Sequence, residues 1–120
     1  MADILVVDDK QDITDLVKMI FEVKGGSVQT AFNGREAIDM LKAHGYDVVL
    51  MDLMMPDING YEALKIIRKD HALKDTVVIA CTARASKQDE ETVLAAGFND
   101  YISKPFRVQH LEETVNKYVH

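Results

Sequence analysis

Three short, uninterrupted apolar runs constrain the fold of this chain more than any other feature of its sequence. They occupy residues 4–7, 48–51 and 77–80, and a polar side chain follows each of them within two residues. Runs of this kind are typical of strands that are buried on both faces of a parallel sheet. The chain is therefore expected to form a sheet that is covered by helices on both sides.

The segments between these runs change to a helical period. After Gln11, apolar residues recur at positions 13, 16, 17, 20 and 21, which lie on one side of a helix. Helices are also predicted after the turn at Asn33 and Gly34, after the loop 53–59, over 87–96 and in the last segment. The more polar stretches 27–32 and 100–103 suit two further strands at the edges of a sheet.

Five strands and five helices in strict alternation predict one parallel sheet with right-handed crossovers. The three apolar strands are expected inside the sheet and the two polar strands at its edges. The resulting strand order is 2-1-3-4-5, the flavodoxin-like, doubly wound α/β arrangement. With 120 residues, positions 1–120 are expected to form a single domain.

Polar side chains gather where the predicted strands end. In open parallel sheets, sites form beyond the carboxyl ends of the strands, at the point where the strand order reverses. Taken singly, each residue has a structural explanation, as a helix cap (Asp9, Thr82), a loop carboxylate (Asp52) or a solvated charge (Lys104). Four strand ends that all carry such groups favour a functional site instead. Its candidate members are Asp8, Asp9, Asp52, Thr82 and Lys104.

Three carboxylates at one place imply a bound cation, because otherwise one of them would tend to take up a proton. Mg²⁺ fits, since it prefers oxygen ligands and is commonly held by one or two carboxylates together with a phosphate. A carboxylate beside Mg²⁺ can attack phosphorus, and Lys104 and the Thr82 hydroxyl can each bind a phosphoryl oxygen. The pattern therefore predicts phosphoryl transfer to an aspartate.

Charge and hydropathy exclude several other classes of protein. The formal charge of −6 argues against direct binding of nucleic acid, which relies on clustered Lys and Arg. No apolar stretch approaches the roughly 20 residues of a membrane span, and the N-terminus lacks a signal pattern. A cytoplasmic protein without membrane insertion is expected. The single cysteine, Cys81, is expected to be a small buried hydrophobe.

Three segments carry a resemblance to a known family. They are ILVVDD at 4–9, VVLMDLMMPDING at 48–60 and YISKPF at 101–106. In residue type, spacing and order, the chain resembles the receiver domain of two-component response regulators, from about residue 3 to the last helix.

The resemblance implies a role for each matching residue. Asp52 would be the phosphoacceptor, and Mg²⁺ would be bound by Asp9, Asp52 and the carbonyl of Met54, with Asp8 acting through a metal-bound water. The resemblance also implies that the Lys104–Pro105 bond is cis. The phosphoryl oxygens would be held by Lys104, Thr82 and the amides of Met54 and Ala83.

The resemblance further implies how the signal is received and passed on. The donor would be a sensor histidine kinase or a histidine phosphotransfer protein. Thr82 would move toward the phosphoryl group, Tyr101 would follow it, and the face of the fourth helix, fifth strand and fifth helix would then bind a downstream protein differently. That target is not identified by the sequence. The chain would be a signalling phosphoacceptor that catalyses only its own phosphorylation and dephosphorylation.

Three alternatives stay open at this point. A hydrolase of the haloacid dehalogenase type would need a second aspartate where Met54 stands and a cap over the substrate. A flavodoxin-like ligand-binding module would need a glycine- or hydroxyl-rich phosphate loop in place of Asp8, Asp9 and Lys10. A receiver that acts only by protein interaction is disfavoured by Asp52 and Lys104 but is not excluded.

Overall fold

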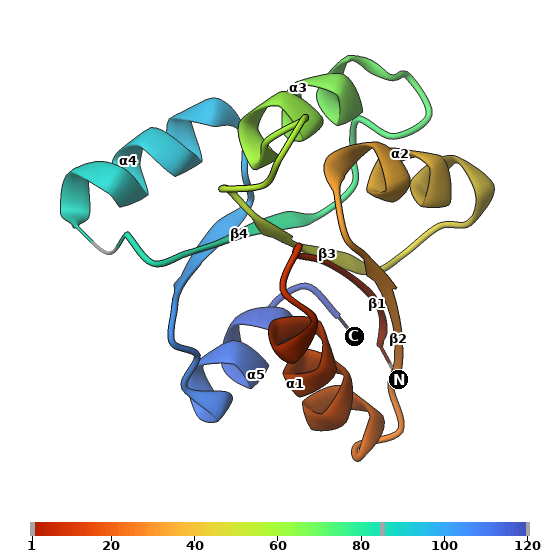
Figure 1. Ribbon diagram of the computed structural model, residues 1–120, viewed down its shortest axis with the longest axis vertical. Helices are drawn as coiled ribbons and strands as arrows, with labels where there is room; N and C mark the ends of the chain where they lie inside the picture. Colours follow the sequence, from red (N-terminus) through yellow and green to blue (C-terminus); the bar gives the residue numbers. More distant parts are fainter. Residues whose placement is uncertain (1, 85, 120) are drawn as a thin grey trace.

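The structure is a computed structural model and describes residues 2–84 and 86–119. Strands and helices alternate along the chain, as Figure 1 shows. Their bounds are β1 Asp3–Val7, α1 Gln11–Glu22, β2 Ser27–Ala31, α2 Gly34–Ala43, β3 Val48–Asp52, α3 Gly60–Lys69, β4 Val78–Thr82, α4 Lys87–Ala96, β5 Asp100–Ser103 and α5 Val108–Asn116.

The five strands form one parallel sheet in the order β2-β1-β3-β4-β5, which confirms the predicted flavodoxin-like arrangement. The apolar strands β1, β3 and β4 lie inside the sheet, and every residue of β3 and β4 is buried. The more polar β2 and β5 lie at the edges, where one side of each strand has no neighbouring strand. The strands at the inside and at the edges of the sheet are therefore those expected from strand hydropathy.

Two hydrophobic cores lie on opposite faces of the sheet. Helices α2, α3 and α4 cover one face, and α1 and α5 cover the other (Figure 1). Neighbouring strand residues point to opposite cores, so Leu5 packs under the first helix group and Val6 under the second. Cys81 is buried in the second core, as predicted for a small hydrophobe. Burial raises the pKa of its thiol to about 12, which keeps it protonated and unreactive.

Side-chain caps fix where three helices begin. The Asn33 side chain accepts the Glu36 amide at the start of α2, and Asn59 forms a capping box with Glu62 at the start of α3. At α4 the cap is Ser86. None of the helices among residues 2–84 and 86–119 combines the length and the apolar character that a membrane crossing requires.

Candidate functional site

The strand register brings the predicted site residues to one edge of the sheet. Val7 lies opposite Met51 in the β1–β3 ladder, so Asp8 and Asp52 come next on the two central strands. The amide of Asp8 donates to the Ala31 carbonyl at 3.0 Å, which holds the chain extended beyond the end of β1. Asp8 and Asp52 are therefore placed by the sheet itself and not by flexible loops.

The next two strands contribute the hydroxyl and the ammonium group. Asp52 lies opposite Cys81, one residue before Thr82, and Thr82 lies opposite Ser103, one residue before Lys104. The Lys104 amide donates to the Thr82 carbonyl at 2.8 Å, and the bond from Lys104 to Pro105 is cis, as the resemblance implied. The four strand ends named in the sequence analysis meet in one place.

Side-chain alternation divides these residues between the two faces of the sheet. Asp52 and Lys104 continue the face of Leu50 and Ile102, which α1 and α5 cover. Thr82 continues the opposite face, which α2, α3 and α4 cover. The acidic groups and the ammonium group thus meet on one side, while the hydroxyl borders α4.

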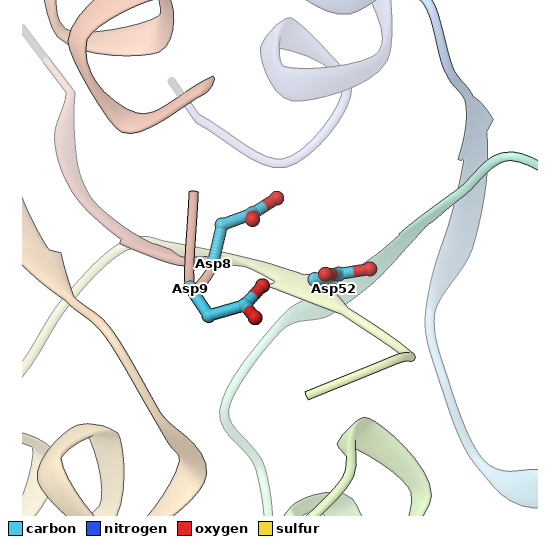
Figure 2. Close-up of side chains that lie close together, drawn as sticks. All are labelled: Asp8, Asp9 and Asp52. Carbon is cyan, nitrogen blue, oxygen red and sulfur yellow. The ribbon is translucent and has the colours of Figure 1, made fainter. Parts of the chain in front are cut away.

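The carboxylates of Asp8, Asp9 and Asp52 converge, as Figure 2 shows. One oxygen from each lies within 4.8 Å of the others. Asp8 and Asp52 are buried, with 1% and 4% of their surface exposed, whereas Asp9 is exposed at the rim. Such a cluster of negative charge is unfavourable without cations close by.

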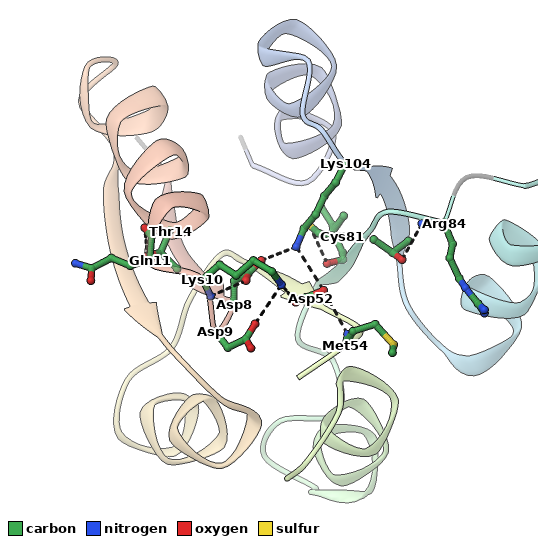
Figure 3. A network of polar contacts seen from close by, with 12 residues as sticks. Asp8, Asp9, Lys10, Gln11, Thr14, Asp52, Met54, Cys81, Arg84 and Lys104 are labelled. Atoms are coloured by element: carbon green, nitrogen blue, oxygen red, sulfur yellow. Dashed lines mark hydrogen bonds and ion pairs between the residues drawn. The ribbon is translucent and has the colours of Figure 1, made fainter. Parts of the chain in front are cut away.

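Lys104 supplies one of those cations. Its Nζ lies 2.6 Å from Asp8 Oδ2 and 3.4 Å from Asp52 Oδ1 (Figure 3). Burial alone would lower the pKa of this ammonium group, but the Asp8 hydrogen bond and the charges of Asp52 and Asp8 outweigh burial and raise it. Lys104 therefore stays protonated and holds a fixed positive charge between two of the carboxylates.

The two oxygens of Asp52 have different surroundings. Oδ1 accepts the Met54 amide at 3.3 Å and faces Lys104, whereas Oδ2 is buried without a hydrogen-bond partner among the described residues. Burial and the nearby Asp8 carboxylate raise the pKa of Asp52, and Lys104, the Met54 amide and Lys10 only partly oppose this rise. A buried oxygen without a partner beside two other carboxylates fits a hard divalent cation such as Mg²⁺.

Thr82 and Tyr101 lie as diagonal neighbours on the α4 side of the sheet. Tyr101 is opposite Ala80 in the β4–β5 ladder, and Thr82 is two residues farther along β4 on the same face. The Thr82 hydroxyl oxygen accepts the Arg84 amide at 3.2 Å and borders a cavity of about 210 Å³ between the β3–α3 loop and α4. The Tyr101 hydroxyl is buried without a hydrogen-bond partner among the described residues, and burial raises its pKa.

Met54 and Ala83 lie in the loops that leave β3 and β4. The Met54 amide already donates to Asp52, while the residue is 73% exposed and lines the cavity beside Thr82. Ala83 is exposed directly after Thr82. Met54 lies two residues after Asp52, and Ala83 directly follows Thr82, so the amides of both residues belong to loops that begin at the candidate site.

The structural alternatives considered for single residues are wrong for this fold. Helix α1 has Lys10 and not Asp9 at its N-cap, without a side-chain cap bond, and α4 is capped by Ser86 and not by Thr82. Asp52 is the last residue of a buried strand, and the Lys104 side chain is only 14% exposed. Capping and solvation therefore do not account for these residues.

Two further residues belong to the site and were not predicted from the sequence. Lys10 reaches back over the carboxylates, with Nζ 3.5 Å from Asp9 Oδ1 and 4.0 Å from Asp52 Oδ2. Gly60 begins α3 so close to the end of β3 that a Cβ atom would lie 2.5 Å from the Asp52 carbonyl oxygen. The position of Lys10 directly after two aspartates was the available signal for the first, and the signal for Gly60 was its place at the end of the segment 48–60 that carries the resemblance.

The chain is similar to known proteins in its sequence. The sequence profile of the response regulator receiver domain matches residues 4–116. The response regulator SaeR of Staphylococcus aureus strain USA300 is 35% identical over 127 residues, an alignment that covers 100% of this chain and 54% of SaeR. The chain therefore spans about half the length of the curated relatives that it matches.

Two solved structures are similar over nearly their whole length. The receiver domain of the Francisella response regulator 1452 is 36% identical with a TM-score of 0.91, and the match covers 98% of this chain and 96% of that one. The receiver domain of the sensor histidine kinase PA1611 from Pseudomonas aeruginosa PAO1 is 31% identical with a TM-score of 0.88, with coverage of 98% and 96%. That structure has a magnesium ion coordinated in its active-site cleft.

Proposed function

The chain belongs to the receiver-domain family of two-component response regulators, a family of signalling phosphoacceptors, and from this premise we propose that Asp52 accepts the phosphoryl group. The single observation that carries the proposal is the convergence of Asp8, Asp9 and Asp52 with the Lys104 ammonium group at one sheet edge. Asp52 is the central member, since it is the carboxylate that contacts both Lys104 and the Met54 amide. We also propose that residues 1–120 act as one domain.

The chemistry is the transfer of an anionic phosphoryl group from a nitrogen atom to an anionic carboxylate. A carboxylate oxygen of Asp52 forms a bond to phosphorus while the bond from phosphorus to a donor nitrogen breaks, and that nitrogen keeps the electron pair and takes up a proton. In the separate reaction that ends the signal, water attacks phosphorus, the bond from phosphorus to the Asp52 oxygen breaks, the Asp52 carboxylate is regenerated and inorganic phosphate leaves. Both reactions act on the chain's own aspartate, so the chain turns over no separate substrate.

Asp9, Asp52 and the Met54 carbonyl would hold Mg²⁺, with Asp8 contributing through a bound water. When bound, the ion would neutralise charge on the carboxylates and on the phosphoryl oxygens. The donor set supports this assignment, because it offers only oxygen ligands and includes the unpartnered Oδ2 of Asp52. The magnesium ion in the PA1611 receiver domain supports it by similarity.

Four further groups are suited to the phosphoryl oxygens. The Lys104 ammonium group is held at the end of β5 and needs little movement to leave Asp8 for a phosphoryl oxygen. The Thr82 hydroxyl accepts the Arg84 amide and still has its own hydrogen to donate to a phosphoryl oxygen. The amides of Met54 and Ala83 would complete the set from the two loops.

A change at Thr82 is expected to reach Tyr101 through their shared face. If Thr82 turns toward the phosphoryl group, the space beside it on the α4 side changes, and the diagonal neighbour Tyr101 responds. The surface of α4, β5 and α5 would then bind a downstream protein differently. The donor would be a histidine kinase or a histidine phosphotransfer protein.

Intact-mass spectrometry tests the proposal. The purified chain is incubated with phosphoramidate and Mg²⁺, and in parallel with EDTA in place of Mg²⁺. We expect the mass of one phosphoryl group on the wild type with Mg²⁺, much less with EDTA, and none on Asp52→Asn. Lack of an adduct on the wild type would favour a receiver that acts by protein interaction alone, and an equal adduct on Asp52→Asn would move the acceptor elsewhere.

A further inference from the structure

A second lysine also lies close to the carboxylates. Lys10 is the N-cap residue of α1, and its Nζ lies 3.5 Å from Asp9 Oδ1 and 4.0 Å from Asp52 Oδ2 (Figure 3). The second of these oxygens is the buried one that has no hydrogen-bond partner among the described residues. The Lys10 ammonium group is thus the cation that approaches Asp52 Oδ2, whereas Lys104 takes Oδ1.

The side chains of Lys10 and Lys104 differ in their burial and in the lengths of their ion pairs. The Lys104 side chain is 14% exposed, and its Nζ lies 2.6 Å from the nearest carboxylate oxygen. The Lys10 side chain is 58% exposed, and among residues 2–84 and 86–119 its ion pairs are the two longer ones at 3.5 and 4.0 Å. An exposed ion pair of this kind is weak, because water competes for both charges. Lys10 can therefore swing away from the carboxylates without unfolding its surroundings, and Lys104 is far less free to do so.

Lys10 lies beside Asp9 and Asp52. These are the two carboxylates that would bind Mg²⁺ directly in the proposed function. The same oxygens cannot face an ammonium group and a divalent cation at once, because the two positive charges would repel each other at close range. We propose that Lys10 is a built-in competitor for Mg²⁺, which neutralises the carboxylates while the metal is absent and lowers the metal affinity of the site. This inference rests on the proposed function, and it adds a residue that controls the Mg²⁺ concentration at which the site is occupied.

The proposal requires effects of opposite sign with and without metal. Without metal, loss of the Lys10 charge leaves the three carboxylates less well compensated, so the folded state becomes less stable. With metal, the same loss removes a repulsive and competing cation, so Mg²⁺ binds more tightly. A lysine that is merely solvated would have neither effect, and a lysine that organises Asp9 for the ion would weaken binding when removed.

Isothermal titration calorimetry with Mg²⁺ at low ionic strength measures the second effect. For Lys10→Gln we expect the dissociation constant to fall by roughly two- to fivefold, the range of a single exposed ion pair. Lys10→Arg keeps the charge and should stay near the wild-type value. Lys18→Gln is the matched control for net charge, since Lys18 is an exposed lysine about 12 Å farther along α1.

Thermal unfolding in EDTA measures the first effect. We expect a lower Tm for Lys10→Gln than for the wild type and for Lys18→Gln. An unchanged or weaker Mg²⁺ affinity of Lys10→Gln, while the wild type binds Mg²⁺, would overturn the inference and leave the proposed function standing. If neither protein binds Mg²⁺, the metal site of the proposed function fails together with this inference.

Discussion

Lys104 and Asp8 form an ion pair of 2.6 Å that joins the end of the last strand to the end of the first. Their side chains are only 14% and 2% exposed, so the pair is largely shielded from water. Removal of the lysine would leave Asp8 as a buried carboxylate without its closest cation. Removal of one partner of this pair is therefore expected to destabilise the fold.

We expect Lys104→Met to lower the free energy of unfolding by about 3 kcal/mol at neutral pH without metal, because a buried charge loses its partner. Urea denaturation measures the change. The matched control is Lys117→Met, whose ammonium group lies 3.6 Å from Asp100 Oδ2 but is 63% exposed. That control should lose less than about 1 kcal/mol. Similar losses in the two variants would show that burial of the Lys104 pair does not matter.

Asp52→Asn should be more stable than the wild type at neutral pH when metal is absent. Burial and the Asp8 charge raise the Asp52 pKa, so folding favours the protonated form and ionisation of Asp52 destabilises the fold. The favourable contribution of protonated Asp52 is present below the ordinary pKa of 3.8 and is lost as the pH rises through the higher pKa of the folded state. The advantage of the variant should therefore disappear in acid.

Thermal unfolding in EDTA across a pH series checks this prediction. Added Mg²⁺ should stabilise the wild type more than the variant, because a ligand that binds only the folded state raises its stability. A lower Tm for Asp52→Asn than for the wild type at neutral pH in EDTA would contradict the account of repulsion among the three carboxylates.

Gly60→Ala should destabilise the fold because of a backbone collision. The new Cβ atom would lie 2.5 Å from the Asp52 carbonyl oxygen and 2.8 Å from the Leu53 Cα, so either α3 or the end of β3 must shift. A loss of about 2 kcal/mol is expected, together with slower phosphorylation of Asp52. Gly45→Ala is the control, since among the described residues no atom beyond its two chain neighbours lies within 4 Å of the added Cβ, and it should change stability by less than about 0.5 kcal/mol.

Two tyrosines with different hydroxyl environments provide a fourth comparison. The Tyr118 hydroxyl lies 3.0 Å from both the Asn99 carbonyl and Asp100 Oδ2, to either of which it donates, whereas the Tyr101 hydroxyl is buried without a partner among the described residues. Tyr118→Phe should lower the free energy of unfolding by about 1 kcal/mol, and Tyr101→Phe should not lower it. Urea denaturation of both variants measures these changes. An equal loss of unfolding free energy in Tyr101→Phe would mean that the Tyr101 hydroxyl does have a hydrogen-bond partner.

Most of the fold is readable from strand hydropathy, because burial on both faces distinguishes the inner strands from the edges. The bounds are less readable. Hydropathy alone places the fourth strand at 77–80, yet β4 runs to Thr82, since the ladder continues from Asp52 opposite Cys81 to Thr82 opposite Ser103. Pairing with neighbouring strands extends a strand into polar residues that its own hydropathy would exclude.

The composition of the site was predictable for a topological reason, since parallel strands in this order bring their carboxyl ends together. Its detailed contacts were not. The sequence does not say that Lys104 lies closer to Asp8 than to Asp52, or that Lys10 turns back from the start of α1. Both depend on side-chain conformations that only the packed structure determines.

The most direct test of the central claim is to identify the residue that carries the phosphoryl group. Borohydride reduces the acyl phosphate of an aspartate to homoserine, so the protein phosphorylated with phosphoramidate and Mg²⁺ is reduced, digested and sequenced by mass spectrometry. The account expects homoserine at position 52 and unchanged aspartate at positions 8 and 9. Homoserine at Asp8 or Asp9, with Asp52 unmodified, would contradict it.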